Sequence, residues 1–407
     1  MTDVTISRRS KVNLGHVEGD LEVERDAVVN AEGGDVVVDG DVVVEGGVVF
    51  NGGLKASEVE AGDGDLDIHG DLTVSGDVTV SDGSLHISGS LASASVDVDK
   101  HLEVGRNVTV ESLDVGSRAE IRGDLKAESV DVGGALAVHG SAEVEHIDAG
   151  GTVQVDGHVT CEDIDVGGSV KVGWGKVNGS IDVGGSFQST GPLQFGEIDV
   201  GGSVELGGDS VGGEIDVGGV VKVNGNLTFE EIDVGGTIEI QGNAEGDEVD
   251  VGGLLTVGQN LTLRRDLEIG GKCKVGGTLV AVDISVGGLM EANEIKADKV
   301  EVGGAIVTKK GVRAEAIVIG DRGRVKGPLI GDTVEIGERS EVEEVYGKRI
   351  MIESRSRVEQ IHGVDVEIEE GCRILGEVLY SGSLDAEEGV SFTVEPKKVD
   401  SLPSPPG

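Results

Sequence analysis

The sequence is poor in aromatic residues, proline and cysteine, and each shortage excludes a class of protein. One Trp, two Tyr and five Phe in 407 residues are too few for an ordinary core built on aromatic side chains. Six Pro, with no Gly at every third position, exclude a collagen triple helix. Three Cys, scattered at positions 161, 273 and 372 without a CxxC pair, indicate neither a disulfide framework nor a zinc site.

Basic residues and long apolar runs are also scarce. Lys and Arg number 33 against 77 Asp and Glu, which gives a formal net charge of −44. Such a charge repels nucleic acid, because DNA and RNA binding draws on Lys and Arg that neutralise phosphates. No apolar run approaches the roughly 18 residues of a membrane span, and the first residues, MTDVTISRRSKVN, lack the apolar segment of a secretory signal. We therefore expect a soluble, cytoplasmic protein that does not bind nucleic acid.

The excess of carboxylates has a second reading. In molar salt, charges are screened within a few ångströms, and an acidic surface keeps a protein dispersed, so the composition points to a halophilic source. The 37% hydrophobic fraction is too high for a disordered acidic chain. Gly, at 70 of 407 residues, is far above its usual share of roughly 7%. A folded but unusual architecture is expected.

A 17-residue repeat dominates the chain. The tetrapeptide DVGG begins at Asp131, and relaxed matches extend the pattern to ten aspartates, Asp97 to Asp250, at an unbroken interval of 17. With Asp as position 1, apolar residues recur at positions 2, 6, 8, 12, 14 and 17, as in Val217, Val221, Val223, Leu227, Phe229 and Ile232. Pairs separated by one residue indicate short strands, and Gly at positions 3 and 4 suits sharp corners by positive φ or close backbone approach.

Three strands and three corners per repeat describe one triangular coil, which buries its apolar face only by stacking on other coils through parallel strands. The fold prediction is an all-β parallel β-helix, a β-solenoid with coils of about 17 residues. We expect the solenoid over residues 19–395, subdivided near 267–300 into a regular DVGG array and a C-terminal segment with more Arg. Residues 1–18 and 396–407 lack the pattern and are expected to be flexible tails.

Stacked aspartates are the first candidate site. A ladder of carboxylates at coil spacing could bind cations, with Asp165, Asp182, Asp199, Asp216, Asp233 and Asp250 as its members. Each Asp lies between two inward residues and so points into solvent, and a solvated acidic face is the simpler interpretation. No catalytic residue and no cofactor site emerge: the eight His share no column, and the Gly-rich strings match neither a P-loop nor a dinucleotide fingerprint, so nucleotide binding is not expected.

Two sets of apolar side chains are candidates for contacts with other molecules. Trp174 occupies a corner position where most repeats have Gly, and an exposed Trp is a possible partner contact. Phe392 follows the last recognisable coil, where an uncapped solenoid exposes its apolar interior. Phe187, Phe195 and Phe229 fall in inward columns and are expected in the core.

Three segments resemble bactofilins, the polymer-forming cytoskeletal β-helix proteins: VEGDLEVERDAVV (17–29), AIVIGDRGRVKGPLIGDTVEIGERSEVEEVYG (316–347) and VDVEIEEGCRILGEVLY (364–380). Given the acidity, the haloarchaeal version, called halofilin, is the closest match. The resemblance implies a right-handed triangular β-helix that joins end to end into nucleotide-independent homopolymers and supports cell shape. It also implies cytoplasmic filaments, often at the inner face of the cell membrane with other cell-shape or membrane-associated proteins. By this analogy Val390, Phe392 and Val394 lie at a polymer junction.

Two alternatives to a polymerising scaffold stay open. One is a non-polymerising acidic β-helix rod that binds a protein partner or cations. The other is a β-helix enzyme, either a hexapeptide acyltransferase or a polysaccharide lyase. The acyltransferases need a repeat of period 18 and a catalytic His near a projecting loop, and the lyases need long loops and an acidic calcium cluster. Because the sequence offers none of these, we expect the protein not to be an enzyme.

Overall fold

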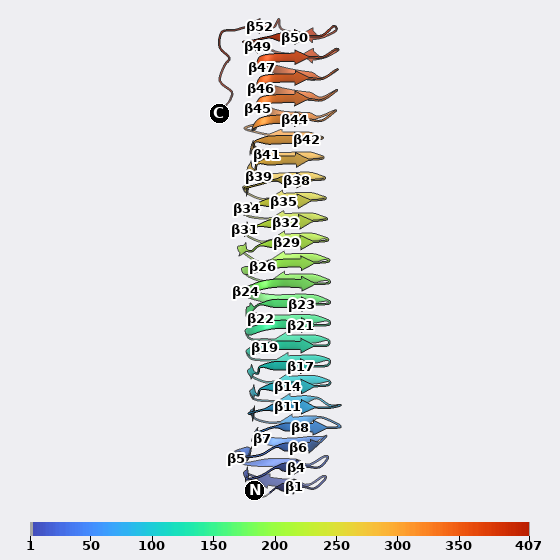
Figure 1. The fold of residues 1–407 in the computed structure, drawn as a ribbon, viewed down its shortest axis with the longest axis vertical. Helices are drawn as coiled ribbons and strands as arrows, with labels where there is room; N and C mark the ends of the chain where they lie inside the picture. Colours follow the sequence, from blue (N-terminus) through green and yellow to red (C-terminus); the bar gives the residue numbers. More distant parts are fainter. Residues whose placement is uncertain (1–2, 407) are drawn as a thin grey trace. The chain divides into compact units, whose positions relative to one another are not determined.

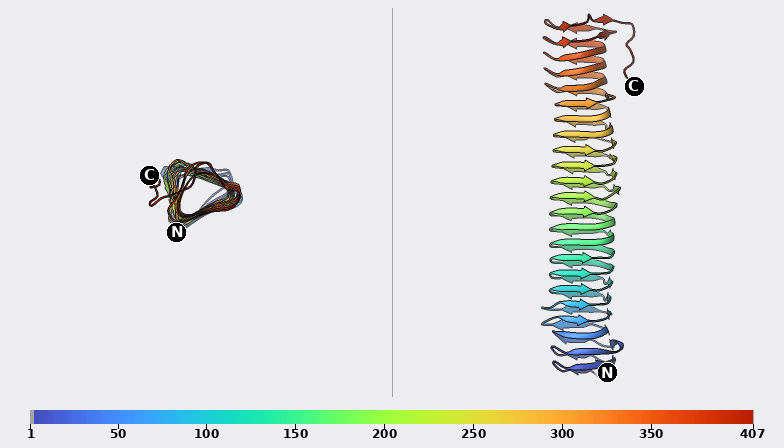
Figure 2. Two further views of the ribbon diagram at one scale, coloured as in Figure 1. Left: turned by 90° about the horizontal axis from the view of Figure 1, so that it is seen from above. Right: turned by 180° about the vertical axis from the view of Figure 1, so that it is seen from behind.

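The computed structural model describes residues 3–406 and is built of strands. In this part of the chain, about 23 coils of about 17 residues form a parallel β-solenoid, which confirms the predicted fold. The chain divides into two compact units, Met1–Gly202 and Ser203–Gly407, and each is a stack of such coils (Figure 1). Seen from above, the coils of each unit trace a triangle (Figure 2).

The first unit contains strands that follow one another around successive coils. They are β1 (Val4–Ile6), β2 (Lys11–Leu14), β3 (His16–Val17), β4 (Leu21–Val23), β5 (Val28–Val38), β6 (Val42–Glu45), β7 (Val48–Ala56), β8 (Val59–Gly62), β9 (Leu66–Ile68), β10 (Leu72–Val74), β11 (Asp77–Val80), β12 (Leu85–Ile87), β13 (Leu91–Ala92), β14 (Ser95–Val98), β15 (His101–Val104), β16 (Val108–Thr109), β17 (Ser112–Val115), β18 (Arg118–Ile121), β19 (Leu125–Val132), β20 (Ala135–Val138), β21 (Ala142–Ala149), β22 (Thr152–Cys161), β23 (Asp163–Val166), β24 (Ser169–Val183), β25 (Ser186–Ser189) and β26 (Leu193–Val200).

The second unit continues the same alternation of strand and corner. Its strands are β27 (Ser203–Leu206), β28 (Ser210–Val211), β29 (Glu214–Val217), β30 (Val220–Val223), β31 (Leu227–Thr228), β32 (Glu231–Val234), β33 (Thr237–Ile240), β34 (Ala244–Gly246), β35 (Glu248–Val251), β36 (Leu254–Val257), β37 (Leu261–Leu263), β38 (Leu267–Ile269), β39 (Lys272–Val280), β40 (Asp283–Val286), β41 (Leu289–Lys296), β42 (Lys299–Val302), β43 (Ala305–Thr308), β44 (Val312–Ile319), β45 (Arg324–Ile336), β46 (Glu341–Ile352), β47 (Arg357–Ile368), β48 (Arg373–Ile374), β49 (Val378–Tyr380), β50 (Leu384–Ala386), β51 (Ser391–Phe392) and β52 (Lys397–Lys398).

Within the regular repeat, each strand pairs in parallel with the strand one coil away, in the register that the repeat predicts. In β17 and β19, for example, Leu113 pairs with Val130 and Asp114 with Asp131. A shift of one residue would turn every apolar side chain outward. Burial of the alternating apolar residues therefore fixes the register between coils.

The core follows the predicted inward positions. Across the repeat that begins at Asp216, the six inward side chains are between 0% and 3% exposed: Val217, Val221, Val223, Leu227, Phe229 and Ile232. Phe187 and Phe195 are equally buried, at 1% and 4%, as expected. The coil therefore replaces the usual aromatic core with stacked columns of Val, Ile and Leu.

The paired glycines of the corners are explained by close backbone approach. A Cβ on Gly168 would lie 2.2 Å from the carbonyl oxygen of Gly151, one coil earlier, and a Cβ on Gly151 would lie 2.5 Å from that of Gly134. Neither glycine has a positive φ. Of the two explanations open from the sequence, steric access at the coil-to-coil contact is the one that applies to these glycines.

The prediction of a flexible tail over residues 1–18 was wrong for the residues the structure describes. β1 pairs with β4 through Val4 and Leu21, and β2 pairs with β5 through Val12 and Val29. The strands of this coil are short, and the interval to the next coil is 17 here and 21 at His16 and Val37. That uneven interval hid the coil from a search for a fixed period.

The expected C-terminal boundaries also need correction. Lys397 and Lys398 form β52 and pair with β49, so residues 396–407 are not a tail throughout. Strand pairing continues through the expected subdivision at 267–300, since β38 pairs with β40 and β40 with β42. The units divide instead between Gly202 and Ser203, where the sequence repeat is still regular.

Candidate functional site

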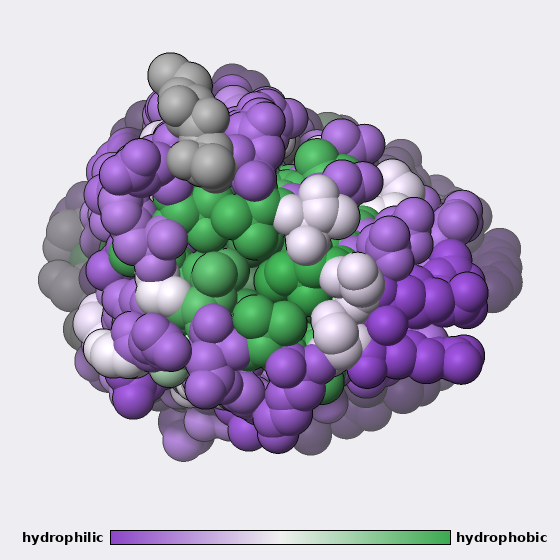
Figure 3. All heavy atoms as spheres, turned by 90° about the horizontal axis from the view of Figure 1, so that it is seen from below, coloured by the Kyte–Doolittle hydropathy of each residue, from purple (hydrophilic) through white to green (hydrophobic). Residues whose placement is uncertain are grey.

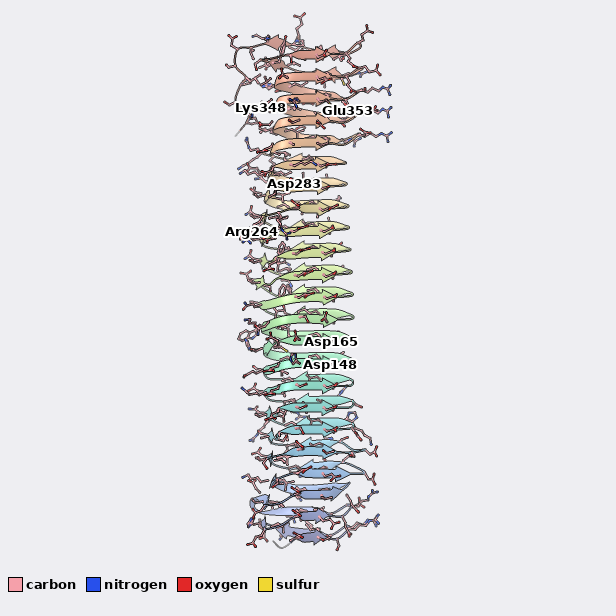
Figure 4. All side chains as sticks on the ribbon, viewed as in Figure 1. Asp148, Asp165, Arg264, Asp283, Lys348 and Glu353 are labelled. Atoms are coloured by element: carbon pink, nitrogen blue, oxygen red, sulfur yellow. The ribbon has the colours of Figure 1, made fainter. Side chains whose placement is uncertain are left out.

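The repeated aspartates form an exposed column on each unit, which we call the Asp column. Asp148 pairs with Asp165 in β21 and β23, and both lie on the same side of successive coils (Figure 4). The candidate ladder residues are all exposed, as predicted: Asp165, Asp182 and Asp199 in the first unit, and Asp216, Asp233 and Asp250 in the second.

At Asp114, neighbouring carboxylates of this column disfavour the charged form of the side chain. Partial burial and the charges of Asp131, Asp97 and Asp99 raise the pKa of Asp114 above its ordinary value. Among residues 3–406, no three His, Cys, Asp or Glu side chains are placed to hold a metal ion together. Like charges therefore lie one coil apart around Asp114 in the Asp column, and cation binding by the six candidate aspartates stays a prediction.

Replacing Asp114 by asparagine should stabilise the protein. A group whose pKa is raised on folding takes up a proton more readily in the folded state, so its charged form opposes folding above that pKa. We expect Asp114→Asn to raise the free energy of unfolding by about 0.2–1 kcal/mol, the usual size of a cross-strand side-chain interaction in a sheet. Thermal unfolding at pH 7 in about 0.1 M salt measures it. The gain should shrink in molar salt, where screening removes the repulsion, and an equal gain at both salt concentrations would contradict the electrostatic explanation.

The three cysteines occupy inward positions, as predicted. Cys161 and Cys273 are 1% exposed and Cys372 is 0% exposed, and all three are free thiols. Burial raises the pKa of Cys161 and of Cys273 to about 12, and raises that of Cys372 as well. They act as small core residues.

These thiols should not react in the folded protein. Only the thiolate attacks a disulfide reagent, and a pKa raised from 9.0 to about 12 reduces its population about a thousandfold. We expect no release of nitrothiobenzoate from Ellman's reagent in native protein near pH 8, and three equivalents after denaturation. Rapid reaction of any thiol before unfolding would show that its coil opens locally.

Trp174 lies on the surface, as the sequence predicted. It is 54% exposed, belongs to β24 and pairs with His158 of β22. The two rings meet edge to face with centroids 4.4 Å apart, so the indole contacts the His158 ring of the neighbouring coil. A role in partner contact stays a prediction.

The C-terminal coil leaves its inward side chains partly uncovered. Val366 pairs with Leu384 and Ile374 with Phe392. The inner member of each pair is 2% or 1% exposed, whereas Leu384 and Phe392 are half-buried. Val390 is half-buried as well, and Val394 is 47% exposed. The structure thus places the three predicted junction residues together at an apolar end of the second unit.

The N-terminal end of the first unit has the same character. Val4 and Val12 are half-buried, although their partners Leu21 and Val29 in the next coil are 0% exposed, and Leu14 is half-buried as well. Figure 3 views this end and shows apolar atoms at its centre, surrounded by hydrophilic side chains. Each end therefore presents the cross-section of a core.

Sequence reasoning missed one further feature, an outward face in the C-terminal coils that the chain covers itself. His362 stands at an outward position of β47, between Ile361 and Gly363, yet it is only 6% exposed. The signal in the sequence was the clustering of both tyrosines, Tyr346 and Tyr380, in the coils just before the Pro-rich segment SLPSPP.

Comparison with known proteins adds no assignment. No family model matches the chain, and neither a curated protein nor a solved structure matches it. Within residues 3–406, no helix is long and apolar enough to cross a membrane.

Proposed function

We propose that this protein is a structural scaffold that assembles end to end through its terminal coils, without nucleotide and without catalysis. The observation that carries the proposal is the uncovered core at the ends. Leu384 and Phe392 continue inward columns that are fully buried one coil earlier. A further coil, supplied by a second copy, would bury them as the inner coils bury theirs.

Strand edges support the same proposal. One edge of β50 pairs with β47 and one edge of β51 pairs with β48, both in the preceding coil. The chain then leaves the stack after β52. Exposed edges and apolar ends together favour continued parallel pairing with another solenoid. The charge of −44 opposes association, so assembly should require high salt.

The resemblance to bactofilins suggests a cellular role for such a scaffold. We propose a halofilin-like polymer in the cytoplasm, acting on cell shape alone or with membrane-associated proteins. The alternative, a rod that does not polymerise, differs in one respect that is easily measured, namely its state of assembly in high salt.

Electron microscopy of the purified protein tests the proposal. In molar salt without nucleotide, we expect the wild type to form filaments and Phe392→Arg to remain as single particles, because a buried unpaired cation at the junction costs several kcal/mol. Val307→Arg is the matched control, since Val307 is 36% exposed on an outward position of β43 and should still assemble. Single particles in the wild type, or filaments in Phe392→Arg with unchanged circular dichroism, would refute assembly through this end.

A further inference from the structure

The last residues described by the structure turn back along the outside of the second unit. After β52, the backbone N–H of Val399 donates to the carbonyl oxygen of Tyr380 at 2.9 Å, and the chain then runs back past β49 and β47 to the level of β45 (Figure 1). The Arg313 guanidinium in β44 donates to the carbonyl oxygen of Pro406. We call residues 399–406 the strap.

The strap has the length of the face that it crosses. Five successive pairings link Arg313 to Lys397, through Ile330, Tyr346, His362 and Leu379. Five coil spacings amount to about 24 Å. The eight residues from Val399 to Pro406 span about 25 Å in the polyproline II conformation, to which Pro403, Pro405 and Pro406 predispose the chain. The strap is therefore stretched along one column of the solenoid.

That column changes its chemistry where the strap covers it. Its outward residues in the preceding coils are polar at four of five positions: Thr228, Glu245, Thr262, Val280 and Lys296. Beyond Arg313 they become Ile330, Tyr346, His362 and Leu379, each half-buried or buried. We call these four residues the outward column. Most other outward positions of this column carry polar side chains. A contiguous group of outward apolar and aromatic side chains therefore indicates a surface that binds another segment of protein.

The strap fills this surface only in part. A cavity of about 540 Å³ is lined on one side by Tyr346 and His362 and on the other by Leu402, Pro403 and Pro405. Leu402 is half-buried, whereas the prolines remain exposed. The groove is thus already formed, and the strap fills only part of it.

His362 contributes to this cavity two buried ring nitrogens without hydrogen-bond partners among residues 3–406. Its ring lies 4.7 Å from that of Tyr346, and neither ring nitrogen has a hydrogen-bond partner among the described residues. Burial lowers the pKa of His362, against the opposing charges of Glu377 and Glu344, so the ring is neutral and offers one donor and one acceptor. The carbonyl groups and serine hydroxyl of a more deeply seated Leu-Pro-Ser-Pro-Pro segment can pair with both. Proline-containing segments use aromatic-lined grooves of this kind.

We propose that the outward column is a docking groove for an extended Leu-Pro-Ser-Pro-Pro segment, covered by the chain's own strap in the isolated molecule and occupied by the strap of a second copy when the two exchange. Exchange of an identical segment preserves each contact made within one chain. A strap tethered beside its groove is present there at an effective concentration in the millimolar range, so a second copy competes only after the resident strap is released. This inference does not depend on end-to-end assembly.

Disulfide trapping tests the exchange. The acceptor carries Glu315→Cys, beside the cavity, and Leu402→Asp to release its own strap. The donor carries Ser404→Cys, between the two cavity-lining prolines. Mixed under oxidised glutathione, donor and acceptor should form covalent dimers about tenfold faster than either protein alone. The rate should fall to that background when the donor also carries Leu402→Asp. The native thiols are buried and stay silent.

One chain with both Glu315→Cys and Ser404→Cys serves as the geometric control and should close on itself. Closure in this control without dimers in the mixture would overturn the second copy as occupant. Failure of both would overturn the groove as a seat for the strap. Phe392→Arg in donor and acceptor should leave the dimer yield unchanged, which separates this result from the end-to-end proposal.

Discussion

Alanine in place of Gly168 is expected to be among the most destabilising single substitutions in the first unit, although it adds one methyl group. The new Cβ would lie 2.2 Å from the carbonyl oxygen of Gly151, and this oxygen belongs to backbone that is bonded into the stack. Relief requires the two coils to separate at that corner. We expect a loss of about 3 kcal/mol in the free energy of unfolding, at the upper end for overpacking.

Gly62→Ala is the matched control. A Cβ on Gly62 would meet no atom within 4 Å, and its φ is not positive, so this change should be neutral or stabilise by up to about 1 kcal/mol through the unfolded state. Denaturant unfolding in molar salt compares the two variants. Hydrogen exchange should also show faster opening in the coils on either side of Gly168, because coils of a solenoid interact only with their neighbours. Equal stability of both variants would show that the glycine corners tolerate a side chain.

Truncation of Phe50 to alanine should have a still larger effect. Phe50 is 0% exposed and stacks between Val29 and Ile68 of the adjacent coils. Its removal leaves a cavity that the two neighbouring coils cannot close without losing their strand pairing. We expect a loss of about 3–5 kcal/mol, measured as the shift in the denaturant midpoint in molar salt.

Val43→Ala provides the comparison for this substitution, because Val43 is 44% exposed on an outward position of β6 in the same unit. Its change should stay within about 0.5 kcal/mol. A loss below about 1 kcal/mol for Phe50→Ala would mean that the N-terminal coils are loosely packed. That result would also weaken the case for β1 and β2 as a true first coil.

Inward and outward positions were predictable because alternation is a local property. A residue between two inward neighbours, such as Asp165, has to face away from the core, and the aspartates of the Asp column are exposed. The same rule placed the three buried cysteines and the core phenylalanines. The candidate end residues followed from the place where the pattern stops.

What covers an outward residue was not predictable from that rule. His362 obeys the alternation and yet is 6% exposed, and it lines a cavity together with Leu402, which lies forty residues further along the chain. No local pattern records a contact at this separation. The first coil escaped for a related reason: β2 and β3 both return to β5, at intervals of 17 and 21 residues, and only the pairing shows that they form one coil.

The sequence by itself determined the 17-residue coil, its three strands, its buried columns and its acidic face, since each of these depends on residues next to one another or one repeat apart. The tertiary structure alone decided where the stack begins and which outward face lies under the strap. It also decided at which glycines a carbonyl group of the preceding coil leaves no room for a Cβ. Those features depend on the path of the backbone through space, and a repeat specifies the step of that path without specifying what lies beside it.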